Sequence, residues 1–227
     1  MKIIIAGVGP GKSDLISLAA INAAKESDLI LVPRSGDGVG VAEKIFSQNI
    51  PDKLTHEIFF PMIKDSQRRR EIIGEQISKL KQKLESSKKI FFPVIGDSVL
   101  YSTGAYLIEE LKKFFPELEI EFIPGISAHS LACSCVKKFM AMSEEIFCII
   151  PGTAETEKIL LSLNSCDSAA IYKPKALKDK KIFDFIKNKF SEIIRVDFAG
   201  LPNEKIFEGS EALENIDEYL SILLLML

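Results

Sequence analysis

The amino-acid sequence predicts an α/β protein of two α/β domains, with a parallel sheet in the first and a mixed sheet in the second. Short apolar runs alternate with longer segments of helical period through most of the 227 residues, and this order is typical of sheets covered by helices. The alternation is less regular in the second half, where the residues at 202–204 indicate a hairpin turn. A proline–glycine turn at 124–127 separates the halves, so we place the domains at 1–124 and 125–227.

The first domain is predicted to contain four strands with helices between them. The apolar runs that we expect to form these buried strands lie at 2–6, 28–32, 89–95 and 118–123. Ser13 or Asp14 can cap the first helix, and Thr103 can cap the last. A short helix is expected at 41–46, and a long polar helix is expected after Asp65.

The second domain is predicted to contain four further strands and an apolar final run. The four strands are expected at 147–150, 168–172, 193–197 and 205–207. One helix is indicated by an apolar face made of Ile182, Phe185, Ile186 and Phe190. The final run, 219–227, is far shorter than the ~20 residues of a membrane-spanning helix. We therefore expect a buried strand at this end of the chain.

Charge and cysteine content limit the classes of function. The net charge is −3, so no overall electrostatic field would attract nucleic acid. The apolar run after Lys2 is too short for a signal peptide, and we expect a cytoplasmic protein that binds neither nucleic acid nor a membrane. The spacing of the four cysteines matches no zinc site, so we expect reduced thiols and no metal; they are Cys133, Cys135, Cys148 and Cys166.

Turns rich in glycine and proline follow three of the predicted strands. They occupy 7–11, 96–101 and 124–128. If the strands are parallel, their carboxyl ends share one edge of the sheet, and α/β proteins bind ligands outside that edge. Glycine lets the backbone bend tightly and approach a ligand closely. The sequence therefore predicts a small-molecule site where these three turns meet.

The first of these turns is open to three interpretations when it is taken alone. A dinucleotide fingerprint requires a third glycine where Lys12 stands, so that interpretation fails. The P-loop of a nucleotide hydrolase is a near miss, because Gly11-Lys12-Ser13 fits its end but Ala6 replaces its opening glycine. Asp97 would then have to serve as the Mg²⁺-binding carboxylate. A plain strand-to-helix turn explains the same residues equally well.

Taken together, the three turns resemble those of the tetrapyrrole methylase family in order, spacing and residue type. The resemblance covers most of the chain, is strongest over 1–151, and includes 199–206, which looks like the family's late hairpin. Three segments look most like the members that methylate carbon 20 of precorrin-2 or of its cobalt-containing counterparts: 59–62, 96–103 and 149–153. One departure is Ser98, where the family usually has proline.

This resemblance implies a homodimeric C-methyltransferase of cobalamin biosynthesis that takes its methyl group from S-adenosylmethionine. It implies an active site in a cleft between the two α/β domains. The implied cofactor contacts are Pro10, Ile95, Gly96, Asp97, Leu100, Ser127, Ala128, Lys173 and Gly200. The implied contacts to the tetrapyrrole substrate are Gly7, Gly9, Gly11, Met62 and Tyr101. The alternatives are a family member that acts on another tetrapyrrole carbon and a tetrapyrrole-binding protein without catalysis.

No catalytic residue can be assigned from the sequence. Methyl transfer from a sulfonium to an electron-rich carbon does not demand a strong base. His129 is the preferred candidate for proton transfer because it follows the 124–127 turn, and Asp97, Glu57 and Tyr101 are alternatives. The many carboxylates of the family's substrates suit basic side chains, for which the candidates are Arg34, Lys64, Arg68, Arg69 and Arg70. For the last two, a solvated helix face is the simpler explanation.

Overall fold

The computed structural model of the protein describes residues 1–36, 40–50, 55–63 and 65–227. The chain divides into two compact units, Met1–Ser127 and Ala128–Leu227, each with its own sheet and core. The break follows the proline–glycine turn, whereas the predicted boundary lies before Gly125. The first sheet is all-parallel and the second is mixed, so the predicted fold class is confirmed.

The sheet of the first unit has five parallel strands in the order β3-β2-β4-β1-β5. They are β1 (Lys2–Gly7), β2 (Leu29–Arg34), β3 (Thr55–Phe59), β4 (Lys89–Val94) and β5 (Glu119–Ile123). Strand β3 was not among the predicted strands. It lies at the edge of the sheet, and Ile58 is its one buried residue, so it has no continuous apolar run. Because β4 and β5 flank β1, the carboxyl ends of these three strands are neighbours.

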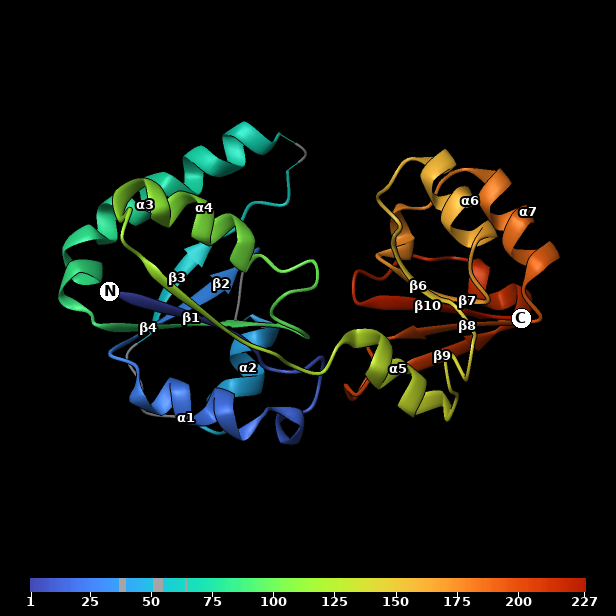
Figure 1. Cartoon of the computed structure of the whole chain (residues 1–227), viewed down its shortest axis with the longest axis horizontal. Helices are drawn as coiled ribbons and strands as arrows, with labels where there is room; N and C mark the ends of the chain where they lie inside the picture. The colour runs from blue at the N-terminus through green and yellow to red at the C-terminus, as the bar shows by residue number, and fades with distance from the viewer. Residues whose placement is uncertain (37–39, 51–54, 64) are drawn as a thin grey trace. The chain divides into compact units, whose positions relative to one another are not determined.

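Two pairs of helices cover the two faces of this sheet (Figure 1). They are α1 (Leu18–Glu26) with α2 (Val41–Ser47), and α3 (Ser66–Ser86) with α4 (Gly104–Phe114). Alternate residues of β1 point to opposite faces. Ile3 and Ile5 join the core under α3 and α4, while Ile4 and Ala6 join the core under α1 and α2. The central strands are buried on both faces, which explains their uninterrupted apolar runs.

The first helix begins later than predicted. Ser13 and Asp14 lie in a 3₁₀ turn, η1 (Ser13–Leu15), and the Oγ of Ser17 caps α1 by accepting the Ala20 N–H at 3.1 Å. The long polar helix begins after Asp65 as predicted, and Asp65 caps it, because its Oδ1 accepts the Arg68 N–H at 3.0 Å.

The cap of α4 also differs from the prediction. Thr103 occupies the N-cap position of α4 but makes no capping hydrogen bond with its side chain. The Oγ of Ser102 accepts the Gly104 N–H at 3.0 Å instead. A hydroxyl one residue away in sequence therefore satisfies a donor at the start of this helix.

The second unit contains a five-stranded mixed sheet in the order β6-β7-β10-β8-β9. Its strands are β6 (Phe147–Pro151), β7 (Ser168–Tyr172), β8 (Glu192–Asp197), β9 (Lys205–Glu208) and β10 (Ser221–Met226). Strands β6 and β7 are parallel, and β10 is antiparallel to both of its neighbours. The apolar final run forms the central strand, which explains why every residue of β10 is buried.

Helices cover both faces of this second sheet. Helix α5 (Ala128–Val136) lies on one face, and α6 (Thr156–Asn164) and α7 (Lys180–Lys189) lie on the other (Figure 1). Short 3₁₀ turns follow β7 and β9, namely η2 (Pro174–Ala176) and η3 (Gly209–Leu213). Helix α6 was not predicted from the sequence. Of the helices in the described ranges, none combines the length and the apolar character that crossing a membrane requires.

Two of the four cysteines are buried in the second unit, and this leads to a labelling prediction. Burial raises the pKa of Cys133 to about 11 and that of Cys166 to about 12. Both thiols therefore stay protonated at pH 8 in the folded protein, and only the thiolate reacts with alkylating reagents. In the unfolded chain the pKa returns to about 8.5.

We expect iodoacetamide at pH 8 to modify these two cysteines at least about a hundredfold more slowly in the native protein than in urea, given the smaller thiolate fraction. Peptide mapping by mass spectrometry measures each site separately. Equal labelling rates for Cys166 with and without urea would contradict this burial.

Candidate functional site

The three predicted turns do meet at the carboxyl edge of the first sheet. Gly9 and Gly96 form an antiparallel bridge, with Gly96 N–H donating to Gly9 C=O at 2.9 Å and Gly9 N–H donating to Gly96 C=O at 3.3 Å. Gly7 and Gly125 lie against the same carbonyl of Gly96. We call these four residues the glycine rim. They come from the last residue of β1 and from the turns after β1, β4 and β5.

The glycine rim is packed too closely for side chains. A Cβ added to Gly7 would lie 2.5 Å from the Gly96 carbonyl oxygen and 2.7 Å from Gly125 Cα. A Cβ on Gly125 would meet the same oxygen and would lie 2.7 Å from the Gly7 carbonyl carbon. Because the obstructing atoms belong to the backbone, they cannot rotate away. Glycine is therefore required at both positions by the contact between turns.

Local backbone geometry explains how two of the turns form. Gly9 and Gly96 have φ angles of +79° and +74°, a region that glycine adopts without strain. After Gly96, the Oδ1 of Asp97 accepts the Val99 N–H at 2.8 Å, which makes an Asx turn. Asp97 thus shapes the loop through its side chain. Tyr101, at φ +51°, is the next residue in the left-handed region.

Around the glycine rim, the predicted residues differ in exposure. Pro10 and Gly11 are buried, Asp97 and Leu100 are half-buried, and Ile95 is exposed. Tyr101 and Met62 are also exposed. Burial raises the pKa of the Tyr101 phenol, so this group stays protonated at neutral pH. Met62 follows β3, and no described contact joins it to the rim.

The geometry of the first turn argues against a P-loop. Lys12 is exposed and extended, with φ −87° and ψ 143°, and a 3₁₀ turn follows it instead of an α-helix. A P-loop lysine reaches the phosphates from the start of an α-helix. The Oδ1 of Asp97 is already used within its own turn. The nucleotide-hydrolase alternative is therefore not supported.

Two predicted residues of the second unit lie at the carboxyl ends of its strands. Lys173, at φ +55°, follows β7, and the neighbouring Gly152 donates its N–H to the Tyr172 carbonyl at 2.7 Å. A Cβ on Gly152 would lie 2.6 Å from the Lys173 carbonyl oxygen, so the loop after β6 is pressed against this end of β7. Gly200, at φ +73°, follows β8, and its N–H donates to Glu204 Oε2 at 2.6 Å.

His129 and Tyr172 form a hydrogen-bonded pair in the second unit. The Nδ1 of His129 lies 2.8 Å from the phenol oxygen of Tyr172, and the His129 backbone N–H donates to that oxygen at 3.3 Å. The histidine was a candidate from the sequence, whereas its partner Tyr172 was not predicted. The signal was the position of Tyr172 as the last residue of an apolar strand, directly before Lys173. Such positions face the ligand edge of an α/β sheet.

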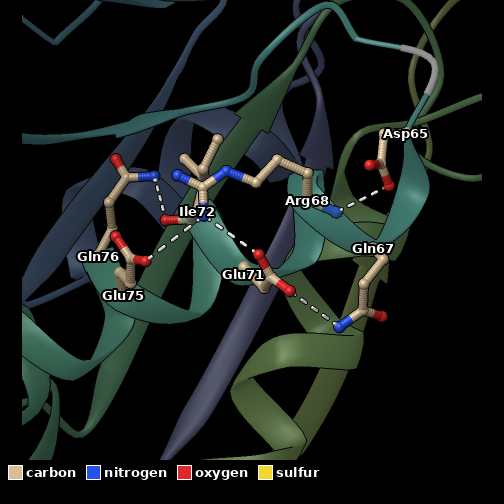
Figure 2. A network of polar contacts seen from close by, with 7 residues as sticks. All are labelled: Asp65, Gln67, Arg68, Glu71, Ile72, Glu75 and Gln76. Atoms are coloured by element: carbon tan, nitrogen blue, oxygen red, sulfur yellow. Dashed lines mark hydrogen bonds and ion pairs between the residues drawn. The ribbon is translucent and has the colours of Figure 1, made fainter.

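The basic side chains that were expected to attract substrate carboxylates are mostly engaged within the chain. Arg34 contacts Glu43 at 2.5 Å and Glu57 at 2.9 Å. Figure 2 shows Arg68 reaching Glu71 and Glu75 along one side of α3, at 3.1 and 3.9 Å.

Two of the remaining basic candidates, Arg69 and Arg70, also have partners within the chain. Arg69 donates to the Ile63 carbonyl and lies over the Tyr106 ring, and Arg70 contacts Glu109 at 3.3 Å. These contacts agree with a solvated helix face. Lys64 lies outside the described residues.

An all-parallel α/β unit with a rim of close-packed glycine turns, followed by an α/β unit with a mixed sheet, defines a two-domain protein that binds small molecules. The family model of the tetrapyrrole (corrin/porphyrin) methylases matches residues 2–213, and the chain belongs to this family.

Two relatives are named as cobalt-precorrin-2 C(20)-methyltransferases. A probable cobalt-precorrin-2 C(20)-methyltransferase of Methanocaldococcus jannaschii is 31% identical over 96% of this chain and 91% of its own. The cobalt-precorrin-2 C(20)-methyltransferase of Salmonella typhimurium is 24% identical over 76% of this chain and 72% of its own.

Among solved structures, a uroporphyrin-III C-methyltransferase from Thermus thermophilus, complexed with S-adenyl homocysteine, has a similar fold. The TM-score is 0.70 at 16% identity, covering 100% of this chain and 97% of that one.

Proposed function

We propose that this protein transfers a methyl group from S-adenosylmethionine to carbon 20 of precorrin-2 or of a cobalt-containing counterpart, as a step of cobalamin biosynthesis. The observation that carries the proposal is the 31% identity to the Methanocaldococcus jannaschii relative over 96% of this chain. The glycine rim supports the proposal, because it lies at the sheet edge where α/β proteins bind ligands.

We infer that S-adenosylmethionine is held mainly by backbone groups. The residues that would hold it are Pro10, Ile95, Gly96, Asp97, Leu100, Ser127, Ala128, Lys173 and Gly200. The tight glycine packing supports this inference in another way, because it fixes the turns that carry Pro10 and the residues at 95–100 at the edge of the sheet. Leu100 is half-buried and can offer an apolar contact. The cofactor supplies a methyl group that is already activated on a sulfonium.

Gly7, Gly9, Gly11, Met62 and Tyr101 are the proposed substrate contacts. Met62 and Tyr101 are 64% and 43% exposed, which is high for apolar and aromatic side chains. Such groups suit the flat face of a tetrapyrrole. The protein's part in the reaction is then to align the accepting carbon and to exclude water. Alignment of this kind lowers a barrier by at most about 7–11 kcal/mol.

The assembly and the location of the protein are separate proposals. We infer a homodimer and a cytoplasmic enzyme from the family resemblance and from the expectation of reduced thiols. Light scattering after size-exclusion chromatography tests the first, since a monomer mass at micromolar concentration would contradict it. Fractionation of the source cells tests the second.

The test of the function uses the purified full-length protein with S-adenosylmethionine and precorrin-2, either metal-free or loaded with cobalt. We expect a product heavier by one CH₂ group, detected by mass spectrometry. A methyl-¹³C donor then locates the new carbon by NMR. Methylation at another carbon would leave the family assignment intact and overturn the carbon-20 proposal. Absence of methylation and of any heat on titration with S-adenosylhomocysteine would overturn both.

A further inference from the structure

The last residue of β3 is held by a side chain of α3 in place of a neighbouring strand. Strand β3 lies at the edge of the first sheet, and an edge strand presents unpaired backbone groups on its outer side. The Phe59 N–H donates to Gln76 Oε1 at 2.8 Å, and Gln76 Nε2 donates to the Phe59 carbonyl at 3.0 Å. One side-chain amide thus supplies both an acceptor and a donor, as a backbone peptide would.

The Gln76 side chain is itself fixed on its helix. Its Nε2 also donates to the carbonyl of Ile72, one turn earlier, at 3.0 Å, and Figure 2 shows this contact. Gln76 is half-buried, and the adjacent Ile73 and Ile77 belong to the core between α3 and the sheet. The amide that holds Phe59 therefore belongs to a helix that is anchored in the core.

The next two residues are anchored in the sheet and its core. The Phe60 N–H donates to the Arg34 carbonyl at 2.6 Å, which continues the pairing of β3 with β2. The Phe60 ring is buried, and its centroid lies 5.8 Å from that of Phe92. Pro61 is buried as well, and its ring fixes the backbone angle φ. The chain therefore leaves β3 along a fixed path.

A second side chain of α3 holds the far end of this segment. The guanidinium of Arg69 donates to the Ile63 carbonyl and lies over the Tyr106 ring, 5.0 Å from its centroid. Between the two anchors, the side chains of Met62 and Ile63 are exposed. We call residues 59–63 the β3 shelf. It presents apolar side chains on a backbone that α3 holds at both ends.

The β3 shelf lies at the ligand edge of the first sheet. Strand β3 is parallel to β2, and β2 is parallel to β4, so their carboxyl ends are at the same edge as the glycine rim. In the order of the sheet, only β2 stands between β3 and β4, the strand that leads to Gly96. With about 4.8 Å between neighbouring strands, the β3 shelf is about 10 Å from that part of the rim across the sheet. A flat macrocycle of four rings can span such a gap.

We propose that Gln76 and Arg69 are positioning residues that hold the β3 shelf as a binding surface for the tetrapyrrole, with Met62 and Ile63 as the contacting side chains. The inference rests on the proposed function and deepens it, because it adds to Met62 the residues that set its place. It also gives Arg69 a backbone carbonyl as its partner, in place of the substrate carboxylate considered from the sequence.

Three substitutions and a matched control test the proposal. Gln76→Met removes the near anchor, because methionine has a similar length but no strong donor or acceptor. Arg69→Met removes the far anchor, and Arg69→Lys keeps a cationic donor there. Met62→Ala removes the contact itself at an exposed position. Gln67→Met is the control, since this glutamine lies on the same helix but meets the Glu71 carboxylate at 3.3 Å (Figure 2).

The dissociation constant of precorrin-2, measured by absorbance with S-adenosylhomocysteine present, reports binding without turnover. We expect Gln76→Met, Arg69→Met and Met62→Ala to raise it about tenfold, as for the loss of one neutral hydrogen bond or of a partly buried apolar contact. Arg69→Lys should recover most of the loss. Gln67→Met, and the affinity of every variant for S-adenosylhomocysteine, should stay within about twofold of the wild type. Hydrogen exchange of the Phe59 amide should become faster in Gln76→Met, because that N–H loses its acceptor.

Two results would show that the anchors are structural only. One is faster exchange at Phe59 in Gln76→Met with unchanged binding of precorrin-2. The other is a loss of affinity for S-adenosylhomocysteine by the same factor as for precorrin-2. Wild-type affinity of Met62→Ala for precorrin-2 would also overturn the proposal, and this variant decides if Gln76→Met does not fold.

Product analysis of the wild type keeps the proposed function separate. A wild type that binds precorrin-2 without methylating it would overturn the proposed function, while the binding constants of the variants would still decide the role of the β3 shelf. A wild type that methylates precorrin-2, with variants that all bind it normally, would overturn the β3 shelf alone. A wild type that binds no precorrin-2 would overturn both.

Discussion

Replacing Gly7 with alanine is expected to reduce methyl transfer by about a hundredfold, because a displacement of the reacting groups by about 1 Å has an effect of this size. The added Cβ would lie 2.5 Å from the Gly96 carbonyl oxygen and 2.7 Å from two backbone atoms of Gly125. All of these atoms belong to other turns of the glycine rim. The turn after β1 must therefore separate from the turns after β4 and β5.

The same substitution should lower the free energy of unfolding by about 1–3 kcal/mol, the usual cost of inserting a methyl group into a packed site. A methyl-transfer assay measures the first effect, thermal unfolding measures the second, and calorimetric titration with S-adenosylhomocysteine measures the affinity for the cofactor product. Gly36→Ala is the matched control, since among the described residues nothing lies within 4 Å of its added Cβ and its φ is not positive.

Gly36→Ala should bind as the wild type does and should change stability by less than about 0.5 kcal/mol. If Gly7→Ala behaved like this control, the close packing of the rim would be wrong. If Gly7→Ala lost stability but kept full affinity and turnover, the rim would be a structural feature and its functional assignment would fail.

The second large effect is expected for Arg195→Met in the second unit, with a loss of about 3–5 kcal/mol in the free energy of unfolding. Arg195 and Asp197 are 2% and 3% exposed, and Arg195 Nε lies 3.2 Å from Asp197 Oδ1. The guanidinium also donates to the carbonyls of Ala212 and Glu214, and it stacks on Phe207 with 4.1 Å to the ring centroid.

Methionine fills much of the same volume but leaves the Asp197 carboxylate buried without its cation. It also removes the donor from two carbonyls in and after η3. The penalty is large because the partner charge remains in a medium of low polarity. Denaturation in urea followed by circular dichroism measures the loss, and hydrogen exchange in β8 and β10 assigns it to the second unit.

Two controls make this second prediction specific. Lys138→Met removes the cation of the Lys138–Glu192 ion pair in the same unit. The side chains of Lys138 and Glu192 are 41% and 42% exposed. We expect a change below about 1 kcal/mol there. The double variant Arg195→Met/Asp197→Leu should recover part of the lost stability, because it removes the stranded charge. A double variant no better than the single one would contradict the electrostatic explanation.

Continuous patterns in the sequence made much of the architecture predictable. The residues of β1, β2 and β4 are buried on both faces, so each appears as an apolar run that needs no tertiary information. Strand β3 was missed because an edge strand with polar Thr55, His56 and Glu57 looks like a loop. The first helix was placed too early because Ser13 and Ser17 are equally good caps by residue type.

Parts of the candidate site were predictable for the same reason. Gly7, Gly9 and Gly96 lie at or just after the ends of apolar runs that were recognisable as strands. A parallel sheet brings the carboxyl ends of its strands to one edge, so the meeting of these glycines could be predicted. The contact between Gly7 and Gly125 links residues more than a hundred positions apart in the chain. Arg34 and Arg68 looked available for a ligand because a sequence does not show which carboxylates lie nearby.

By itself, the sequence determined the fold class, the family resemblance and the existence of three turns at strand ends, because each depends on local order along the chain. Only the tertiary structure decided which groups meet: Gly9 with Gly96, Arg195 with Asp197, and His129 with Tyr172. The physical reason is that hydrogen bonds and ion pairs depend on distances of a few ångströms between atoms. Those distances are set by how whole elements pack, and residue type alone does not encode them.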